Sequence, residues 1–235
     1  MTARFFRRAI AWSDYTAKTG LIPPANVEPP PAQYNIAPSQ LAFVLRVSSP
    51  GLYLGDYAPY GAVILQPAFW RFIPTWWRPS ISEEPYSSFT ARADNLLDSR
   101  MFQGAFSHGR CVIPASGFYA WSGPKGASTP VAFGLKDADW FCMAGLWSRV
   151  LIEGSEIDTF ALITVDANDE VATCSASMPV VLRPEHTARW LDPSAHNPGA
   201  LLRPYPADEM RSWPAHPDVG DVRNQGDWVV GEPGR

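Results

Sequence analysis

The chain has 235 residues, of which 46% are hydrophobic and 18% charged, a composition typical of a globular protein and not of a disordered one. This length is enough for one domain with a full hydrophobic core. The formal net charge of −4 excludes a general polyanion-binding protein, so any nucleic-acid site must be a local basic patch.

Targeting signals and metal motifs are missing from the sequence. The opening MTARFFRRAIAW has no apolar run of signal-peptide length, and no stretch approaches the roughly 18 apolar residues of a membrane span. The three cysteines, Cys111, Cys142 and Cys174, lack metal-ligand spacing and read as reduced thiols. We therefore expect a cytoplasmic protein with no metal, no cofactor and no membrane partner; its oligomeric state is left open.

The first part of the chain predicts short elements between loops. Apolar and β-branched residues favour strands, and a glycine after a periodic segment ends a helix. We expect a strand or a buried tail at 1–6, a helix at 9–18 closed by Gly20, a proline-rich loop at 21–33, and strands at 41–47 and 62–65.

The stretch FWRFIPTWW, residues 69–77, is aromatic and is broken by Pro74, which favours an irregular surface segment over a central strand. Trp70 is expected in the core, because nearby Phe69 and Phe72 are apolar. Trp76 and Trp77 face opposite ways in an extended chain, so at least one of them is expected at the surface. Residues 78–88 read as a loop insertion.

The second part of the chain is richer in strands. Leu96, Leu97, Met101 and Phe102 have helical spacing, which predicts a helix within 94–106. We expect strands at 111–114, 117–121, 131–135, 141–146, 160–165 and 180–182, helices at 167–173 and 184–191, and a tail at 227–235. This order predicts a single α+β domain over 1–235, with a curved and mainly antiparallel sheet or barrel flanked by helices.

Common catalytic motifs do not occur. The sequence has no phosphate loop, no HExxH and no nucleophile elbow. Its four histidines, His108, His186, His196 and His216, lie in probable loops or helix edges and read as surface side chains. A stronger signal is the combination of Trp76 and Trp77 with nearby arginines, because aromatic rings can stack on bases and guanidinium groups can hold phosphates.

Eight segments, taken in order, resemble the SRAP family of SOS-response-associated peptidases, or abasic-site-processing proteins. The resemblance covers nearly the whole chain. The segments are YNIAPSQ (34–40), FWRFIPTWW (69–77), FTARADN (89–95), GRCVIPASGFYAW (109–121), MAGLW (143–147), TFALITVDANDEVATCSASMP (159–179), RPYP (203–206) and VGDVRNQG (219–226).

The resemblance implies binding of single-stranded DNA at abasic sites. In this family, the cysteine after the initiator methionine attacks the sugar aldehyde with its thiol and α-amine and forms a DNA–protein crosslink. A glutamate and a histidine assist proton transfer, and an asparagine orients the site. Removal of the initiator methionine is the basis of the peptidase label.

This chain departs from the family at those same positions. Thr2 replaces the cysteine, Ala120 the glutamate and Ser175 the histidine; Thr90 replaces the asparagine, and Ser177 an arginine. A threonine hydroxyl without a base is a poor nucleophile, and loss of general acid–base groups alone typically costs ~10²–10⁴-fold in rate. The positions that match the family's DNA-contacting residues are better kept: Arg4, Pro38, Trp76, Trp77, Arg92, Arg100 and Thr164.

Three functional hypotheses follow. The first is a SRAP-like protein that binds single-stranded or abasic DNA without the cysteine crosslink. The second is a residual enzyme in which the α-amine of Thr2, exposed by methionine removal, forms a Schiff base with the abasic aldehyde; Cys174 is a weaker candidate for a substitute thiol. The third is a protein-interaction module on the same fold, for which the aromatic patch would form the interface.

Overall fold

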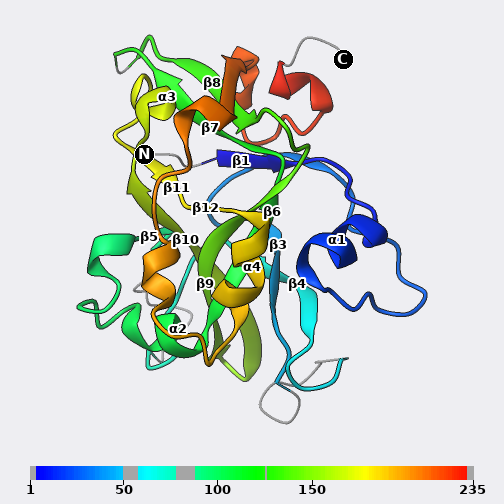
Figure 1. Cartoon of the computed structure of the whole chain (residues 1–235). Coiled ribbons are helices and arrows are strands. Elements are labelled where there is room, and N and C mark those ends of the chain that lie inside the picture. The colour runs from blue at the N-terminus through cyan, green and yellow to red at the C-terminus, as the bar shows by residue number, and fades with distance from the viewer. Residues whose placement is uncertain (1–3, 50–57, 78–87, 125, 232–235) are drawn as a thin grey trace.

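The structure is a computed structural model that describes residues 4–49, 58–77, 88–124 and 126–231. Strands dominate it, with short helices on the outside (Figure 1). The helices are α1 (Trp12–Thr19), α2 (Gln103–His108), α3 (Asp169–Ala172) and α4 (Pro184–Leu191). Within the described residues, no helix is long and apolar enough to cross a membrane. The predicted α+β fold is confirmed.

Five strands close into a barrel. Because β10 pairs with both β4 and β9, the order β10–β4–β3–β6–β9 returns to β10. These strands are β3 (Leu41–Val47), β4 (Val63–Phe69), β6 (Arg110–Ala115), β9 (Phe141–Ile152) and β10 (Ser155–Asp166). Gly145 on β9 allows close packing inside the barrel, since a Cβ there would lie 2.3 Å from Ile113 Cδ1.

Three shorter strands extend this sheet, and a second sheet of five strands lies beside it. The extensions are β5 (Thr90–Arg92), β11 (Ser177–Pro179) and β12 (Val181–Leu182). The second sheet has the order β13–β8–β7–β1–β2. Its strands are β13 (Met210–Pro214), β8 (Thr129–Leu135), β7 (Gly117–Ser122), β1 (Arg4–Arg7) and β2 (Gln33–Ile36). Ser116 alone separates β6 from β7, which ties the two sheets together.

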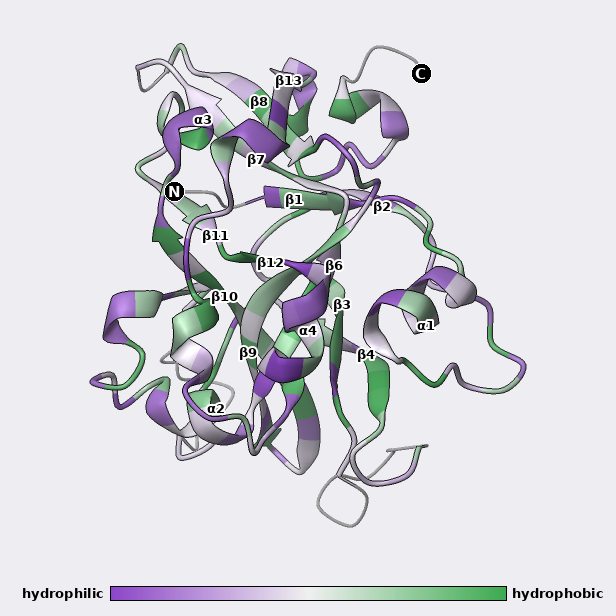
Figure 2. Cartoon of the chain, in the orientation of Figure 1, coloured by the Kyte–Doolittle hydropathy of each residue, from purple (hydrophilic) through white to green (hydrophobic). Residues whose placement is uncertain are grey.

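Aromatic packing fills the main core. Trp70 is fully buried, its indole nitrogen donates to the backbone oxygen of Phe89 at 2.8 Å, and its ring lies 5.1 Å from that of Phe5 and 6.2 Å from that of Phe160. The expectation that Trp70 belongs to the core is confirmed. Figure 2 shows α4 with both hydrophobic and hydrophilic residues, and the helix buries Trp190 and Leu191 against the barrel.

The predicted helix within 94–106 is wrong as one continuous element. Ala93–Asn95 forms a short 3₁₀ turn, an irregular turn follows, and α2 begins only at Gln103. Leu96 and Phe102 are buried while Leu97 is 66% exposed, so the apolar residues do not share one helical face.

Two further segments differ from the expectations for the end of the chain. Strand β13 was not predicted from the sequence. In the predicted tail, Asp227–Val230 forms a 3₁₀ turn that buries Val229 and Val230. The predicted insertion at 78–88 lies outside the described residues except for Ser88.

Candidate nucleic-acid interface

The positions expected to carry acid–base chemistry hold side chains that cannot perform it. Ala120 lies on β7 and is 1% exposed. Ser175 is buried, and its hydroxyl donates to the backbone oxygen of Ser177 at 2.8 Å. Thr2 lies outside the described residues. Neither Ala120 nor Ser175 can transfer a proton near neutral pH, so these two positions supply no general acid or base.

Arg92 and Thr164 come together through a parallel strand pair. β5 pairs with β10 in a register that places Thr164 opposite Arg92 and Leu162 opposite Thr90. Thr164 is buried, whereas the Arg92 side chain is 41% exposed and can reach a ligand at the surface. A cavity of about 400 Å³ borders both residues.

Two carboxylates hold the Arg92 guanidinium. Its Nη2 lies 2.9 Å from Asp94 Oδ2 and 3.0 Å from Asp166 Oδ1. The hydrogen bonds that Arg92 donates to Asp94 and then to Asp166 raise the pKa of Arg92, and the same bond to Asp94 lowers the pKa of that carboxyl. A phosphate that binds Arg92 must therefore compete with these two negative charges.

Trp76 and Arg100 form a second surface pair. Trp76 is 43% exposed, its indole nitrogen donates to the backbone oxygen of Arg100 at 3.2 Å, and the Arg100 guanidinium lies 4.7 Å from the ring centroid. Trp77 is half-buried. The expectation that at least one of the two tryptophans is exposed is confirmed. A cavity of about 250 Å³ lies beside Trp76 and Arg100 and continues to His108.

Pro38 lies in a turn fastened to the aromatic segment. Ser39 adopts a left-handed φ of 68°, and its amide donates to the backbone oxygen of Trp70 at 2.9 Å. The amide of Trp70 donates back to Gln40 at 2.9 Å. Pro38 itself is half-buried. These bonds place the proline turn beside the start of the segment that carries Trp76.

Arg4 is half-buried, and its guanidinium donates hydrogen bonds to other parts of the protein. Its Nη1 donates to Asn35 Oδ1 at 2.8 Å and to the backbone oxygen of Val219 at 2.7 Å, and its Nη2 donates to Gly220 at 3.2 Å. Burial lowers its pKa, although nearby Asp221 opposes that effect. Arg4 therefore anchors the C-terminal segment to β1, and these donors are not directed at a ligand.

Sequence reasoning missed the partners of these arginines. Asp94 is two residues from Arg92, so a pairing was within reach of the sequence. Asp166 is 74 positions away and becomes a neighbour only through the pairing of β5 with β10.

Cys174 is half-buried, with its Sγ 3.4 Å from the Thr173 hydroxyl. In the described ranges, no group of three or more His, Cys, Asp or Glu side chains could hold a metal ion.

The closed β-barrel, together with the eight segments that follow one another in family order, defines the class of protein. The chain belongs to the SOS response associated peptidase (SRAP) family, whose model matches residues 1–222. It is 30% identical over 197 residues to the abasic site processing protein YoqW of Bacillus subtilis, covering 81% of this chain and 82% of that protein. It is 26% identical over 202 residues to the abasic site processing protein YedK of Escherichia coli, covering 84% and 83%.

Solved structures share the fold. A protein from Bacteroides thetaiotaomicron superposes with a TM-score of 0.71 at 22% identity, over 99% of this chain and 97% of that chain. A protein from Bordetella bronchiseptica gives a TM-score of 0.72 at 21% identity, over 91% and 99%. At these identities the likeness supports the fold alone.

Proposed function

We propose that this protein binds single-stranded DNA, with or without an abasic site, and forms no cysteine-type crosslink to it. The observation that carries the proposal is the contrast between two sets of positions. Arg92, Trp76 and Arg100 keep cationic and aromatic side chains at the surface. Ala120 and Ser175 provide no titratable group where the crosslinking chemistry needs one.

Relatives support the DNA part of the proposal. Proteins that align with more than four fifths of this chain are named abasic site processing proteins. Loss of the thiol, the acid and the base removes the steps that form and resolve a covalent bond, but it leaves a surface on which bases can stack and phosphates can bind. We place the action of the protein in the response to DNA damage and expect it in the cytoplasm.

The test is a gel assay on one labelled single strand, with and without an abasic site. Native and denaturing gels are run side by side, and one denaturing lane receives borohydride. We expect a shift in the native gel and no covalent band. A covalent band with borohydride would instead identify Schiff-base chemistry on the amine of Thr2. Absence of any shift at low salt would overturn DNA binding and redirect the search to protein partners.

A matched pair of variants locates the binding surface. Trp76→Ala removes an exposed ring, and base stacking on an aromatic side chain is worth about 1–3 kcal/mol per base. Affinity should fall by roughly five- to 150-fold. Arg189→Gln changes an exposed arginine on α4 that donates to His196, and it serves as the control with unchanged affinity. Equal losses in both variants would argue against stacking at Trp76.

A further inference from the structure

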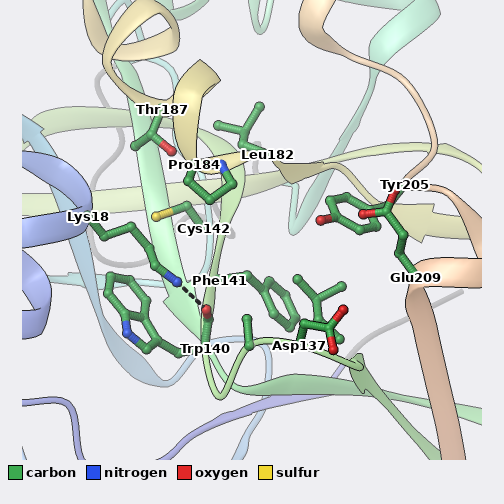
Figure 3. A pocket seen from close by; sticks show the side chains of 12 residues that line it. Lys18, Asp137, Trp140, Phe141, Cys142, Leu182, Pro184, Thr187, Tyr205 and Glu209 are labelled. Atoms are coloured by element: carbon green, nitrogen blue, oxygen red, sulfur yellow. Dashed lines mark hydrogen bonds between the residues drawn. The ribbon is translucent and has the colours of Figure 1, made fainter.

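A separate cavity of about 170 Å³ lies between α1, α4 and the loop that joins β8 to β9 (Figure 3). Lys18 comes from α1, Trp140 from the loop, Cys142 from β9 and Thr187 from α4. Tyr205 and Glu209 form the other side. This cavity shares no lining residue with the cavities beside Arg92 or Trp76.

Lys18 supplies a cation at one end of the cavity. Its Nζ donates to the backbone oxygen of Trp140 at 2.6 Å and lies 4.1 Å from the centroid of the indole ring (Figure 3). Burial lowers the pKa of Lys18, while Cys142, Asp14 and Asp139 oppose that effect. In the described part of the chain, no carboxylate forms an ion pair with it. A half-buried ammonium with donors to spare favours an anion beside it.

Three aromatic residues and one cysteine form a buried part of the cavity wall. Trp140, Phe141, Cys142 and Tyr205 line it with exposed fractions of 8%, 2%, 1% and 7%. Burial raises the pKa of Cys142 to about 12, so the thiol is neutral and acts as part of the wall. Such a surface receives the body of a ligand by apolar contact.

The far side of the cavity is acidic. Figure 3 shows the carboxylates of Asp137 and Glu209 across the cavity from the Lys18 ammonium. Glu209 is paired with Arg183, whereas Asp137 is exposed. A ligand with a second negative charge would meet repulsion there, so the charge pattern favours a single carboxylate.

We propose that this cavity binds a small aromatic monocarboxylate, with its carboxylate on Lys18 and its ring against Trp140, Phe141 and Tyr205. The size is appropriate, because an apolar cavity of about 150 Å³ accommodates benzene. The site is independent of the DNA-binding proposal.

The test uses the whole protein and three probes that share a phenylacetyl core. Phenylacetate carries one charge, phenylacetamide carries none, and 4-(carboxymethyl)benzoate carries a second carboxylate at the far end of its ring, where it would meet Asp137 and Glu209. Binding is measured by calorimetry, and the indole N–H signal of Trp140, assigned with Trp140→Phe, reports the site. We expect phenylacetate to bind at least about tenfold more tightly than phenylacetamide, as one charge-assisted hydrogen bond allows, and more tightly than the dicarboxylate. Absence of phenylacetate binding in the millimolar range, or equal binding of the amide, would overturn the proposal.

A pair of lysine variants tests the role of the ammonium. Lys18→Met keeps the aliphatic stem and should abolish the preference for phenylacetate over phenylacetamide. Lys136→Met makes the same chemical change at an exposed lysine that does not line the cavity and should keep the preference. Circular dichroism establishes that both variants are folded. A preference retained in folded Lys18→Met would refute the assignment, and the probe comparison on the unmodified protein decides the matter even if that variant does not fold.

Discussion

Asp166→Asn should strengthen DNA binding by releasing Arg92. The exchange removes one of the two negative charges beside Arg92. It keeps a side-chain oxygen that can still accept a hydrogen bond from the guanidinium. The side chains of Arg92, Asp94 and Asp166 are 41%, 60% and 82% exposed, so their charges act through a water-like medium. In that medium, one unit charge about 4 Å away changes a binding constant by roughly fivefold. We therefore expect about fivefold tighter binding of single-stranded DNA at low salt.

The salt dependence of binding provides the assay. Affinity falls as salt rises, and each phosphate contact to a single strand contributes about −0.7 to the slope of log affinity against log salt. Arg92→Gln should make this slope less negative by about 0.7 if Arg92 contacts a phosphate. Fluorescence anisotropy of a labelled strand at several salt concentrations measures both the affinity and the slope.

A double-variant cycle tests whether the gain in affinity from Asp166→Asn depends on Arg92. If the gain from Asp166→Asn arises through Arg92, it should disappear in the Arg92→Gln background. Glu156→Gln is the control, because Glu156 pairs with Arg149 at 3.2 Å and lies away from Arg92 on the β9–β10 hairpin. A gain that persists without Arg92, or that Glu156→Gln reproduces, would show that only the net charge of the protein matters.

Three further predictions concern stability and reactivity. Trp70→Ala should lower the free energy of unfolding by about 3–5 kcal/mol in urea titrations, because it empties a fully buried site. Hydrogen bonds from Arg223 lower the pKa of Asp221 to about 2, so the stability advantage of the unmodified protein over Asp221→Asn should be present above about pH 4 and vanish as the pH falls through 2. Burial raises the pKa values of the Cys111 and Cys142 thiols, so iodoacetamide should label half-buried Cys174 in the native protein and the other two only after unfolding, as mass spectrometry would show.

Local patterns predicted the elements whose residues carry their own signals. The expected strand at 41–47 and helix at 184–191 agree with β3 and α4, because the first is apolar except for Arg46 and the second begins at a proline and buries one face. The expected strand at 141–146 is the first half of β9, and the expected strand at 160–165 lies almost entirely in the second half of β10; both strands are about twice as long as expected. The end of β9 and the start of β10 form a hairpin that contains polar residues. These ends are strands because they pair with each other, and their composition alone does not predict it.

The candidate site was predictable in its residue types but not in its electrostatics. The alternation of neighbouring side chains predicted that at least one of Trp76 and Trp77 is exposed, but not which one. The pairing of Arg92 with Asp166 was not predictable, because a parallel strand pairing between distant segments brings the two residues together. The internal role of Arg4 likewise depends on backbone oxygens at Val219 and Gly220, more than 200 positions away.

These two arginines change the balance of forces on which DNA binding would depend. Arg4 donates hydrogen bonds to Asn35 and to the backbone at Val219, and Arg92 forms ion pairs with two carboxylates. The phosphate contribution per arginine is therefore smaller than in a site with unpaired guanidinium groups, and stacking on Trp76 has to supply a larger share of the free energy of binding. On the proposed function, a surface of this kind would hold a strand through its bases, whose stacking is much less sensitive to salt than phosphate contact. Because stacking needs unpaired bases, the same balance favours single-stranded over duplex DNA.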